Sequence, residues 1–440
     1  MTMENKNVQP NDVLNSLGKH MLVDGYHVVL DLDKSHDCVM VDARDGKEFV
    51  DFYAFFASLP LGFNHPKMRN PEFLDALKEV SIHKVANSDI YTTRMADFVD
   101  SFAKLGAHPA FNNYFFIDGG ALAVENALKA AFDWKVRKNF TKGYQEEKGS
   151  KVLHFRQAFH GRTGYTMSLT NTDPTKTKFF PQFDWPRVSN PKIHFPLTAE
   201  SIEDVEKREA QTIVEIKNAI QENKDDIAAL IIEPIQGEGG DNHFRGEFLR
   251  ALREITEENE ILFIADEVQT GLGATGKMWA FEHFGIQPDI VSFGKKVQVC
   301  GIMATDKLND VDSVFKVSSR INSTWGANIT DMVRSQRILE IIHEDNLVDN
   351  AARMGDHLLK RIHEVGETAK TAITNIRGRG LIAAFDLPTP EIRNSVAASC
   401  WEKGLAVLKC GDQTIRFRPS LTIDSETIDK GISILADALS

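Results

Sequence analysis

The chain has 440 residues, which is enough for two or three domains and for a large hydrophobic core that needs no disulfide or metal. Its 51 basic and 63 acidic residues give a formal net charge of -12. This balance argues against a nucleic-acid-binding protein, which presents a concentrated basic surface. No apolar run approaches ~18 residues, so the sequence predicts a globular protein without a membrane span.

The N-terminal segment and the cysteines both indicate a cytoplasmic protein. The first residues, MTMENKNVQPNDVL, are polar and lack the apolar core of a secretory signal. The four cysteines follow no zinc-binding spacing and are too few for a disulfide scaffold: Cys38, Cys300, Cys400 and Cys410. We therefore expect free thiols in a reducing compartment and no metal site.

A helix that begins with small residues is predicted in GGALAVENALKAAFDW. Its apolar residues recur on one helical face: Val124, Ala127, Leu128 and Ala131. Gly119, Gly120 and Ala121 would form the first turn, where open backbone N–H groups and the helix dipole favour an anion. Because a plain turn into a core helix has the same pattern, this segment alone identifies no site.

The middle of the chain alternates short apolar runs with helical patterns. Helices are expected at 201–222 and 246–259. Buried strands are expected at KVLHF (151–155), AALII (228–232), ILFIA (261–265) and DIVSF (289–293). Such alternation predicts a mostly parallel sheet covered on both faces, with any ligand at the carboxyl ends of the strands.

Asp266 follows one of these strands and begins the segment DEVQTG. A carboxylate at the edge of a core must be solvated, paired or bound to a ligand. The next segment, GLGATGK (271–277), resembles both a dinucleotide fingerprint and the start of a P-loop. We reject a nucleotide site there, because Met278 replaces the Ser or Thr that a P-loop needs and no strand directly precedes it.

Lys295 follows the strand DIVSF and Gly294, at the mouth of the sheet. Partial burial at such a position would lower the pKa of the amine and make it a nucleophile for aldehydes. Lys296 is the competing residue. Since neighbours on a strand face opposite ways, only one lysine would point into a site, and the spacing favours Lys295.

The last part of the chain has a different pattern. Two helices are expected across 331–365, followed by IRGRGLIAAFDL, a helix near 390–403, and the segments LAVLKC and TIRFRPSL. The predicted organisation is an N-terminal segment (1–65) that joins the small domain, a large α/β domain (66–330) and a smaller α+β domain (331–440).

Together, a strand-end lysine, a strand-end aspartate and an anion-binding helix start match the needs of pyridoxal phosphate. This cofactor requires a lysine for its aldehyde, a carboxylate for its pyridine nitrogen and a cradle for its phosphate. The combination is more specific than any of the three features alone.

These residues resemble the class III aminotransferases of the fold-type I pyridoxal-phosphate enzymes. The similarity extends over nearly the whole chain and is carried by DEVQTG and DIVSFGK, with FHGRTG (159–164), EPIQGEGG (233–240), NSTWGAN (322–328) and RFRPSL (416–421) in the family's order. Within the class, FFIDGGALAVENALKAAFDWK and FGKKVQVCG are most similar to the lysine ε-aminotransferases. The resemblance implies a large domain with a mostly parallel sheet and a smaller α+β domain.

The resemblance also implies roles around the cofactor ring. Lys295 would carry the cofactor as a Schiff base and shuttle the substrate proton, while Asp266 would pair with the pyridine nitrogen. Val268 and Phe159 would lie on opposite faces of the ring. Gln269 would contact the phenolic oxygen and the substrate.

For the phosphate, the resemblance implies backbone N–H groups of Gly120 and Ala121. Relatives that act on ornithine or acetylornithine usually have a hydroxyl in this turn, and none is present here. Thr324 would reach the same phosphate from the partner subunit, which implies a homodimer with shared active sites.

For the substrates, the resemblance implies that Arg162 and Arg416 hold carboxylates, with Arg418 as the alternative to Arg416. Glu238 would gate Arg416, and Asn322 would also contact substrate. The expected reaction transfers the ε-amino group of L-lysine to 2-oxoglutarate through pyridoxamine phosphate. Ornithine, 4-aminobutyrate and acetylornithine are the competing amine donors.

Overall fold

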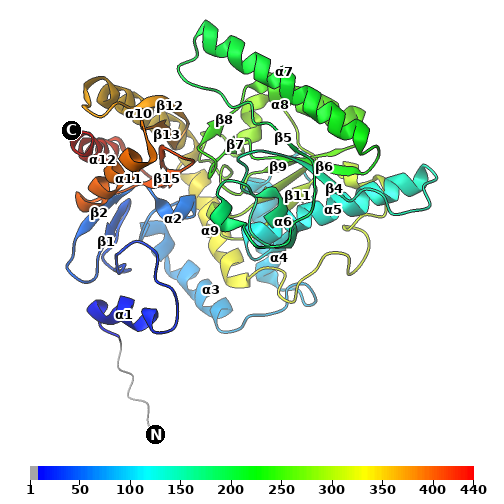
Figure 1. The fold of residues 1–440 in the computed structure, drawn as a ribbon. Helices are drawn as coiled ribbons and strands as arrows, with labels where there is room; N and C mark the ends of the chain where they lie inside the picture. Colours follow the sequence, from blue (N-terminus) through cyan, green and yellow to red (C-terminus); the bar gives the residue numbers. More distant parts are fainter. Residues whose placement is uncertain (1–7) are drawn as a thin grey trace.

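The computed structural model describes residues 8–440, and its centre is a seven-stranded sheet with helices on both faces (Figure 1). The strand order is β3-β11-β10-β9-β6-β4-β5. Neighbouring strands from β10 to β5 run parallel, whereas β11 runs antiparallel to both of its neighbours. The bounds are β3 Asn113–Ile117, β4 Lys151–Phe155, β5 Arg187–Val188, β6 Ile227–Ile232, β9 Leu262–Asp266, β10 Ile290–Phe293 and β11 Cys300–Ala304.

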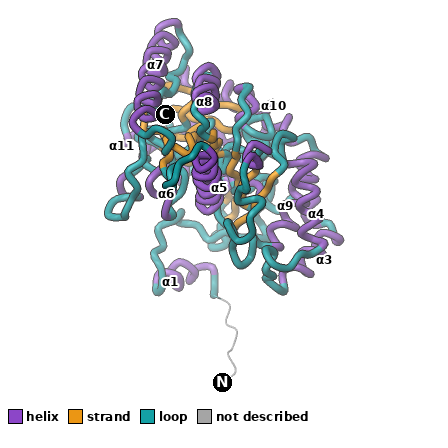
Figure 2. The backbone as a smooth tube through the Cα atoms, turned by 90° about the vertical axis from the view of Figure 1, so that its right-hand side faces the viewer, coloured by secondary structure: helices purple, strands orange, loops and turns teal. Residues whose placement is uncertain are grey.

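Both faces of this sheet are buried, as the packing of β6 illustrates. Leu230 and Ile232 belong to a core that includes residues of α7 (Ala199–Glu222) and α8 (Gly246–Glu258). The alternate residues, Ala229 and Ile231, belong to a second core with α5 (Gly120–Thr141). A strand buried on two faces must be apolar at every position, which is why β6 reads as one continuous apolar run. Figure 2 shows the strands at the centre with helices around them.

The structure confirms the predicted middle of the chain. The four expected strands are β4, β6, β9 and β10, and the two expected helices are α7 and α8. The sequence does not predict β3 and β11, although they complete one end of the sheet. β11 contains Gly301 and begins only a few residues after the turn that holds Lys295, so its five residues lack a strand pattern of their own.

The C-terminal part forms a four-stranded antiparallel sheet with helices against it, which confirms the expected α+β pattern. α9 (Ile329–Glu344) and α10 (Leu347–Thr368) are the two expected helices, separated at Asn346, whose φ is 51°. The remaining elements of this part are β12 Thr374–Arg379, β13 Ile382–Asp386, α11 Pro390–Glu402, β15 Leu408–Cys410, β16 Thr414–Phe417 and α12 Ser425–Ala438. The helix expected near 390–403 is confirmed as α11, whereas α12 is not predicted.

The N-terminal segment pairs with this C-terminal part. β1 (Val39–Val41) and β2 (Glu48–Asp51) form a small sheet with β14 (Leu405–Ala406). The assignment of this segment (1–65) to the small domain stays a prediction, and its residues 1–7 lie outside the described residues. The boundaries at 65 and 330 remain predictions. Further elements are α1 Val13–Gly18, α2 Ala54–Ala57, α3 Pro71–Ser81, α4 Thr93–Ser101, α6 Gly164–Leu169, β7 Ile235–Gln236 and β8 Asn242–His243.

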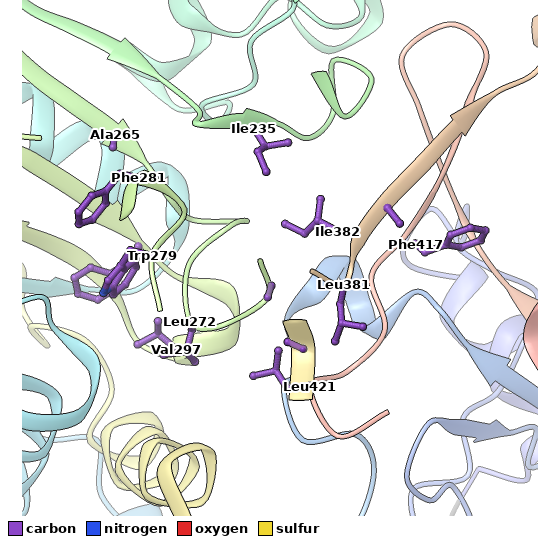
Figure 3. Packing of buried hydrophobic residues seen from close by; sticks show 14 of the residues in the cluster. Ile235, Ala265, Leu272, Trp279, Phe281, Val297, Leu381, Ile382, Phe417 and Leu421 are labelled. Atoms are coloured by element: carbon purple, nitrogen blue, oxygen red, sulfur yellow. The ribbon is translucent and has the colours of Figure 1, made fainter. Parts of the chain in front are cut away.

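A continuous apolar core connects the large sheet to the C-terminal part. Figure 3 shows Leu272 and Val297 on one side of this cluster and Leu381 and Leu421 on the other. The glycine-rich segment 271–277 forms turns here, and the carbonyl of Ala274 accepts a hydrogen bond from Leu381 N (2.8 Å). It therefore packs between the two parts of the chain, without the flanking strand and helix that a nucleotide-binding loop requires.

None of the helices in residues 8–440 combines the length and apolarity needed to cross a bilayer.

Candidate active site

A cavity of about 730 Å³ opens at the carboxyl ends of the parallel strands. Phe159 and His160 reach it after β4, and Glu233 reaches it after β6. Asp266, the last residue of β9, and Lys295, which follows β10, also line it. The sheet topology thus brings together residues that are up to 136 positions apart in the sequence. This is the edge at which open α/β sheets bind ligands.

Only one of the two neighbouring lysines lines the cavity. Lys295 is half-buried there, and its Nζ donates a hydrogen bond to the carbonyl of Phe56 (3.1 Å). Burial, helped by the positive charge of Arg416, lowers the pKa of Lys295 to about 8. Lys296 is buried elsewhere, where its Nζ donates to the carbonyls of Gln269 (2.6 Å) and Ala57 (3.3 Å).

The reason for this separation differs from the one expected. Lys295 and Lys296 lie in a 3-10 turn, Lys295–Val297, rather than on the strand, so strand alternation does not apply to them. Lys295 has a φ of 51°, in the left-handed region that a non-glycine residue seldom adopts. The conformation of this turn therefore separates the two side chains.

Asp266 is buried and fully hydrogen-bonded on its protein side. Its Oδ1 accepts from Val268 N and from Ser292 Oγ, both at 3.1 Å. Its Oδ2 lies 2.7 Å from His160 Nδ1. His160 is buried, and its other nitrogen, Nε2, has no hydrogen-bond partner among the described residues. This network holds a carboxylate in the cavity wall in a fixed orientation.

The start of α5 borders the cavity with small residues. Gly119, the N-cap, has a φ of 96° and provides no side-chain cap. Gly120 and Ala121 line the cavity. A Cβ on Gly120 would lie 2.8 Å from Cγ1 of Val268, so only glycine fits without displacing that side chain. The first turn therefore presents its uncapped backbone N–H groups where a phosphate would be stabilised.

Arg416 lies behind the cavity wall and is covered by Glu238. Arg416 is fully buried, forms an ion pair with Glu238, and donates from Nη1 to Gln269 Oε1 (3.1 Å). Glu238 and Gln269 line the cavity between Arg416 and the solvent. Burial of Glu238 opposes its ionisation, but the charges of Arg416 and Lys176 outweigh this and lower its pKa to about 2.

Arg418, the competing arginine, is paired with a different carboxylate. Its Nη1 donates to Asp241 Oδ2 (2.8 Å), and its Nη2 pairs with the other oxygen of the same carboxylate. Asp241 is fully buried, so this two-point pair is an internal contact. Of the two arginines, only Arg416 is paired with a carboxylate that itself lines the cavity.

Three exposed residues complete the set implied by the resemblance, and only one of them lies at the cavity. Arg162 is exposed at the cavity and has no hydrogen bond or ion pair to any described residue. Asn322 and Thr324 are exposed and lie outside this cavity. Their segment is fixed by Ser88, whose Oγ donates to the carbonyl of Ser323 (2.8 Å). The single chain therefore does not bring Asn322 or Thr324 to the site.

The structure also adds site residues that the sequence does not predict. Phe55 and Phe56 line the cavity from α2, in which all four residues have positive φ values between 39° and 64°, so this turn is left-handed. The buried carboxylate of Asp51 accepts hydrogen bonds from Tyr53 N and Ala54 N, both at 2.8 Å, and fixes the start of the turn. No sequence signal indicates four left-handed residues without glycine.

His160 and Lys176 are further additions. His160 follows Phe159 in FHGRTG. A buried carboxylate such as Asp266 needs a hydrogen-bonding partner, and this need is the sequence signal that points to His160. Lys176 ends a three-residue 3-10 turn, Pro174–Lys176, which is too short for a periodic sequence pattern to predict. The residues that line the cavity nonetheless fit pyridoxal phosphate: an amine of lowered pKa, a buried carboxylate, an open helix start, and Phe159 with Val268 as apolar surfaces.

Comparisons with known proteins agree with this geometry. The family model for "Aminotransferase class-III" matches residues 21–439. The chain is 46% identical over 432 residues to an L-lysine-epsilon aminotransferase of Mycobacterium tuberculosis, covering 98% of this chain and 96% of that protein. It is 45% identical over 438 residues to an L-lysine-epsilon aminotransferase of Streptomyces clavuligerus, covering 98% and 95%.

A solved structure gives the same result in three dimensions. The chain superimposes on the lysine aminotransferase from M. tuberculosis in the internal aldimine form with a TM-score of 0.96. The match covers 98% of this chain and 99% of that one, at 46% sequence identity. The similarity thus extends over both the sheet domain and the C-terminal part.

Proposed function

Because the chain belongs to the class-III aminotransferase family, we propose that this aminotransferase moves the ε-amino group of L-lysine to 2-oxoglutarate. The products are 2-aminoadipate 6-semialdehyde and L-glutamate, and pyridoxal 5'-phosphate is the cofactor. Near-full-length relatives that are named lysine aminotransferases support the choice of substrate. The observation that carries it is the state of the two arginines: Arg416 behind the cavity wall is neutralised by Glu238, while Arg162 at the cavity pairs with no residue among 8–440.

The charges of the two substrates explain why such a pairing is useful. L-lysine has a single carboxylate, which lies far from its ε-amine, whereas 2-oxoglutarate has a carboxylate at each end. Arg162 binds the carboxylate of lysine, and Glu238 keeps the cation of Arg416 away from the amine end. When 2-oxoglutarate binds, Glu238 moves aside and Arg416 binds the second carboxylate.

The cofactor supplies an aldehyde that accepts the amine and a ring that withdraws electrons from the carbon next to it. Asp266, held by His160, would keep a proton on the ring nitrogen by its negative charge. Lys295 Nζ would act as the base that removes the proton from the ε-carbon of lysine. Its pKa of about 8 gives it enough neutral amine for this step near neutral pH.

The remaining contacts position the reactants. Gly120 and Ala121 would bind the phosphate group through their N–H groups, and Gln269 would contact the phenolic oxygen. Phe159 and Val268 would hold the ring. With the cofactor bound, these contacts would hold the reactants close to Lys295, and the apolar surfaces would exclude water from them.

We also propose that the enzyme is a cytoplasmic homodimer. Thr324 and Asn322 are exposed and outside the cavity of their own chain, as expected of residues that complete the site of a partner subunit. The four cysteines are free thiols, which suits a reducing compartment.

The experiment is a half-reaction between the cofactor-loaded enzyme and L-lysine, with identification of the carbonyl product. We expect 2-aminoadipate 6-semialdehyde, which cyclises because its own α-amine reaches the aldehyde. Lys295→Ala serves as the control without transfer. Parallel reactions with ornithine, 4-aminobutyrate and acetylornithine test the competing donors, and faster transfer from any of these would overturn the proposal.

A further inference from the structure

Lys176 contributes a second cation to the carboxylate of Glu238. It ends a short 3-10 turn, Pro174–Lys176, and its side chain lines the cavity. Its Nζ lies 3.2 Å from Glu238 Oε2, whereas Arg416 pairs with Oε1. The same Nζ lies over the ring of Phe159, 5.2 Å from its centroid. Glu238 is therefore shared between one buried cation and one cation at the cavity surface.

This arrangement matters when Glu238 leaves Arg416. A second carboxylate that reaches Arg416 would come close to the carboxylate of Glu238, and two like charges in a partly desolvated cavity repel each other. Glu238 must then have another cation to pair with. Because Lys176 already contacts Oε2, rotation of the carboxylate away from Arg416 can break one ion pair while the other is kept.

We propose that Lys176 is the positioning residue that holds Glu238 after a dicarboxylate displaces it from Arg416. Lys176 thereby favours binding of dicarboxylate acceptors through Glu238, without contacting the ligand itself. The ring of Phe159 keeps the ammonium group over the cavity, where Glu238 can reach it. This inference rests on the proposed function, since it concerns the change of substrate between the two half-reactions.

The test is a double-mutant cycle read by ligand binding. The cofactor-loaded enzyme is titrated calorimetrically with glutarate, a dicarboxylate without a reactive carbonyl. The pair between Lys176 and Glu238 is present before and after glutarate binds, so only its strengthening once Arg416 no longer shares the carboxylate affects the Kd. We expect Lys176→Met to raise the Kd of glutarate about threefold, which is less than the effect of a whole partly exposed ion pair. In a Glu238→Gln background, where no carboxylate has to be held, Lys176→Met should leave the Kd unchanged.

Two further variants serve as controls for the loss of the positive charge. Lys178→Met removes the same charge two residues away, where Lys178 is exposed and lies over Phe179 rather than in the cavity, and should bind glutarate as the wild type does. Lys176→Arg should restore affinity. Equal weakening by Lys176→Met in both backgrounds would show direct contact with the ligand, and no weakening in either would show no role; both results overturn the inference.

Glutarate binding requires no amine donor. If L-lysine proves not to be the donor, the proposed function fails while the cycle still reports on Lys176, so the two failures are distinguishable.

Discussion

Replacement of Glu238 by Gln removes the charge that neutralises Arg416 and keeps the shape of the cavity wall. Arg416 is fully buried, and its other carboxylate neighbour, Asp241, is 3.9 Å away and already paired with Arg418. Leaving a fully buried charge unpaired costs about 3–5 kcal/mol. The side chain of Glu238 is 20% exposed, so water reaches the site. We therefore expect the unpaired charge of Arg416 to cost about 2 kcal/mol in the variant.

This cost is present both in the free variant and in its complex with lysine, so it cancels in kcat/KM for lysine. The lysine half-reaction should still slow about tenfold, because the cation of Arg416, no longer neutralised, repels the positively charged amine. When 2-oxoglutarate is bound, its second carboxylate takes the place of Glu238 and removes the cost, so about 2 kcal/mol corresponds to up to about a 30-fold gain in kcat/KM for that half-reaction. Stopped-flow absorbance of each half-reaction measures both values. Equal losses in the two half-reactions would refute the reasoning.

Three further outcomes are expected. Capture of pyridoxal phosphate by the apoenzyme requires the neutral amine of Lys295; since the pKa is lowered from 10.5 to about 8, the rate should rise with pH and reach half its maximum near pH 8. Gly120→Ala places a Cβ against Val268 and should weaken cofactor binding about tenfold, as measured by fluorescence titration. Asp241→Asn leaves Arg418 buried without its carboxylate and should lower the free energy of unfolding by about 3–5 kcal/mol in urea.

The sequence predicts the centre of the fold because the physical signal there is strong. β6 is buried on both faces, so each of its residues is apolar, and amphipathic helices flank it. The helix α5 is also predicted from burial, because Ala127 and Leu128 belong to the core and recur with helical spacing. By contrast, β3 begins with the partly buried Asn113 and Tyr114, and β11 contains Gly301, so neither strand gives a comparable apolar signal.

The candidate site is predicted in part. Asp266 and Lys295 are predicted because each comes at the end of a strand that the sequence pattern indicates. Parallel strands then bring their carboxyl ends together. The left-handed turn with Phe56 is not predicted, since it is held by a local hydrogen bond to Asp51 that gives no sequence signal and by a tertiary one from Lys295 to the carbonyl of Phe56. The sequence also leaves Arg416 and Arg418 open, and only their partners, Glu238 and Asp241, distinguish them.

The most direct test of the account is the position of the cofactor's attachment. The enzyme loaded with pyridoxal phosphate is reduced with borohydride and digested, and the modified peptide is sequenced by mass spectrometry. The phosphopyridoxyl group should be on Lys295, whose side chain lines the cavity. A label on Lys296, or no label in this peptide, would contradict the account.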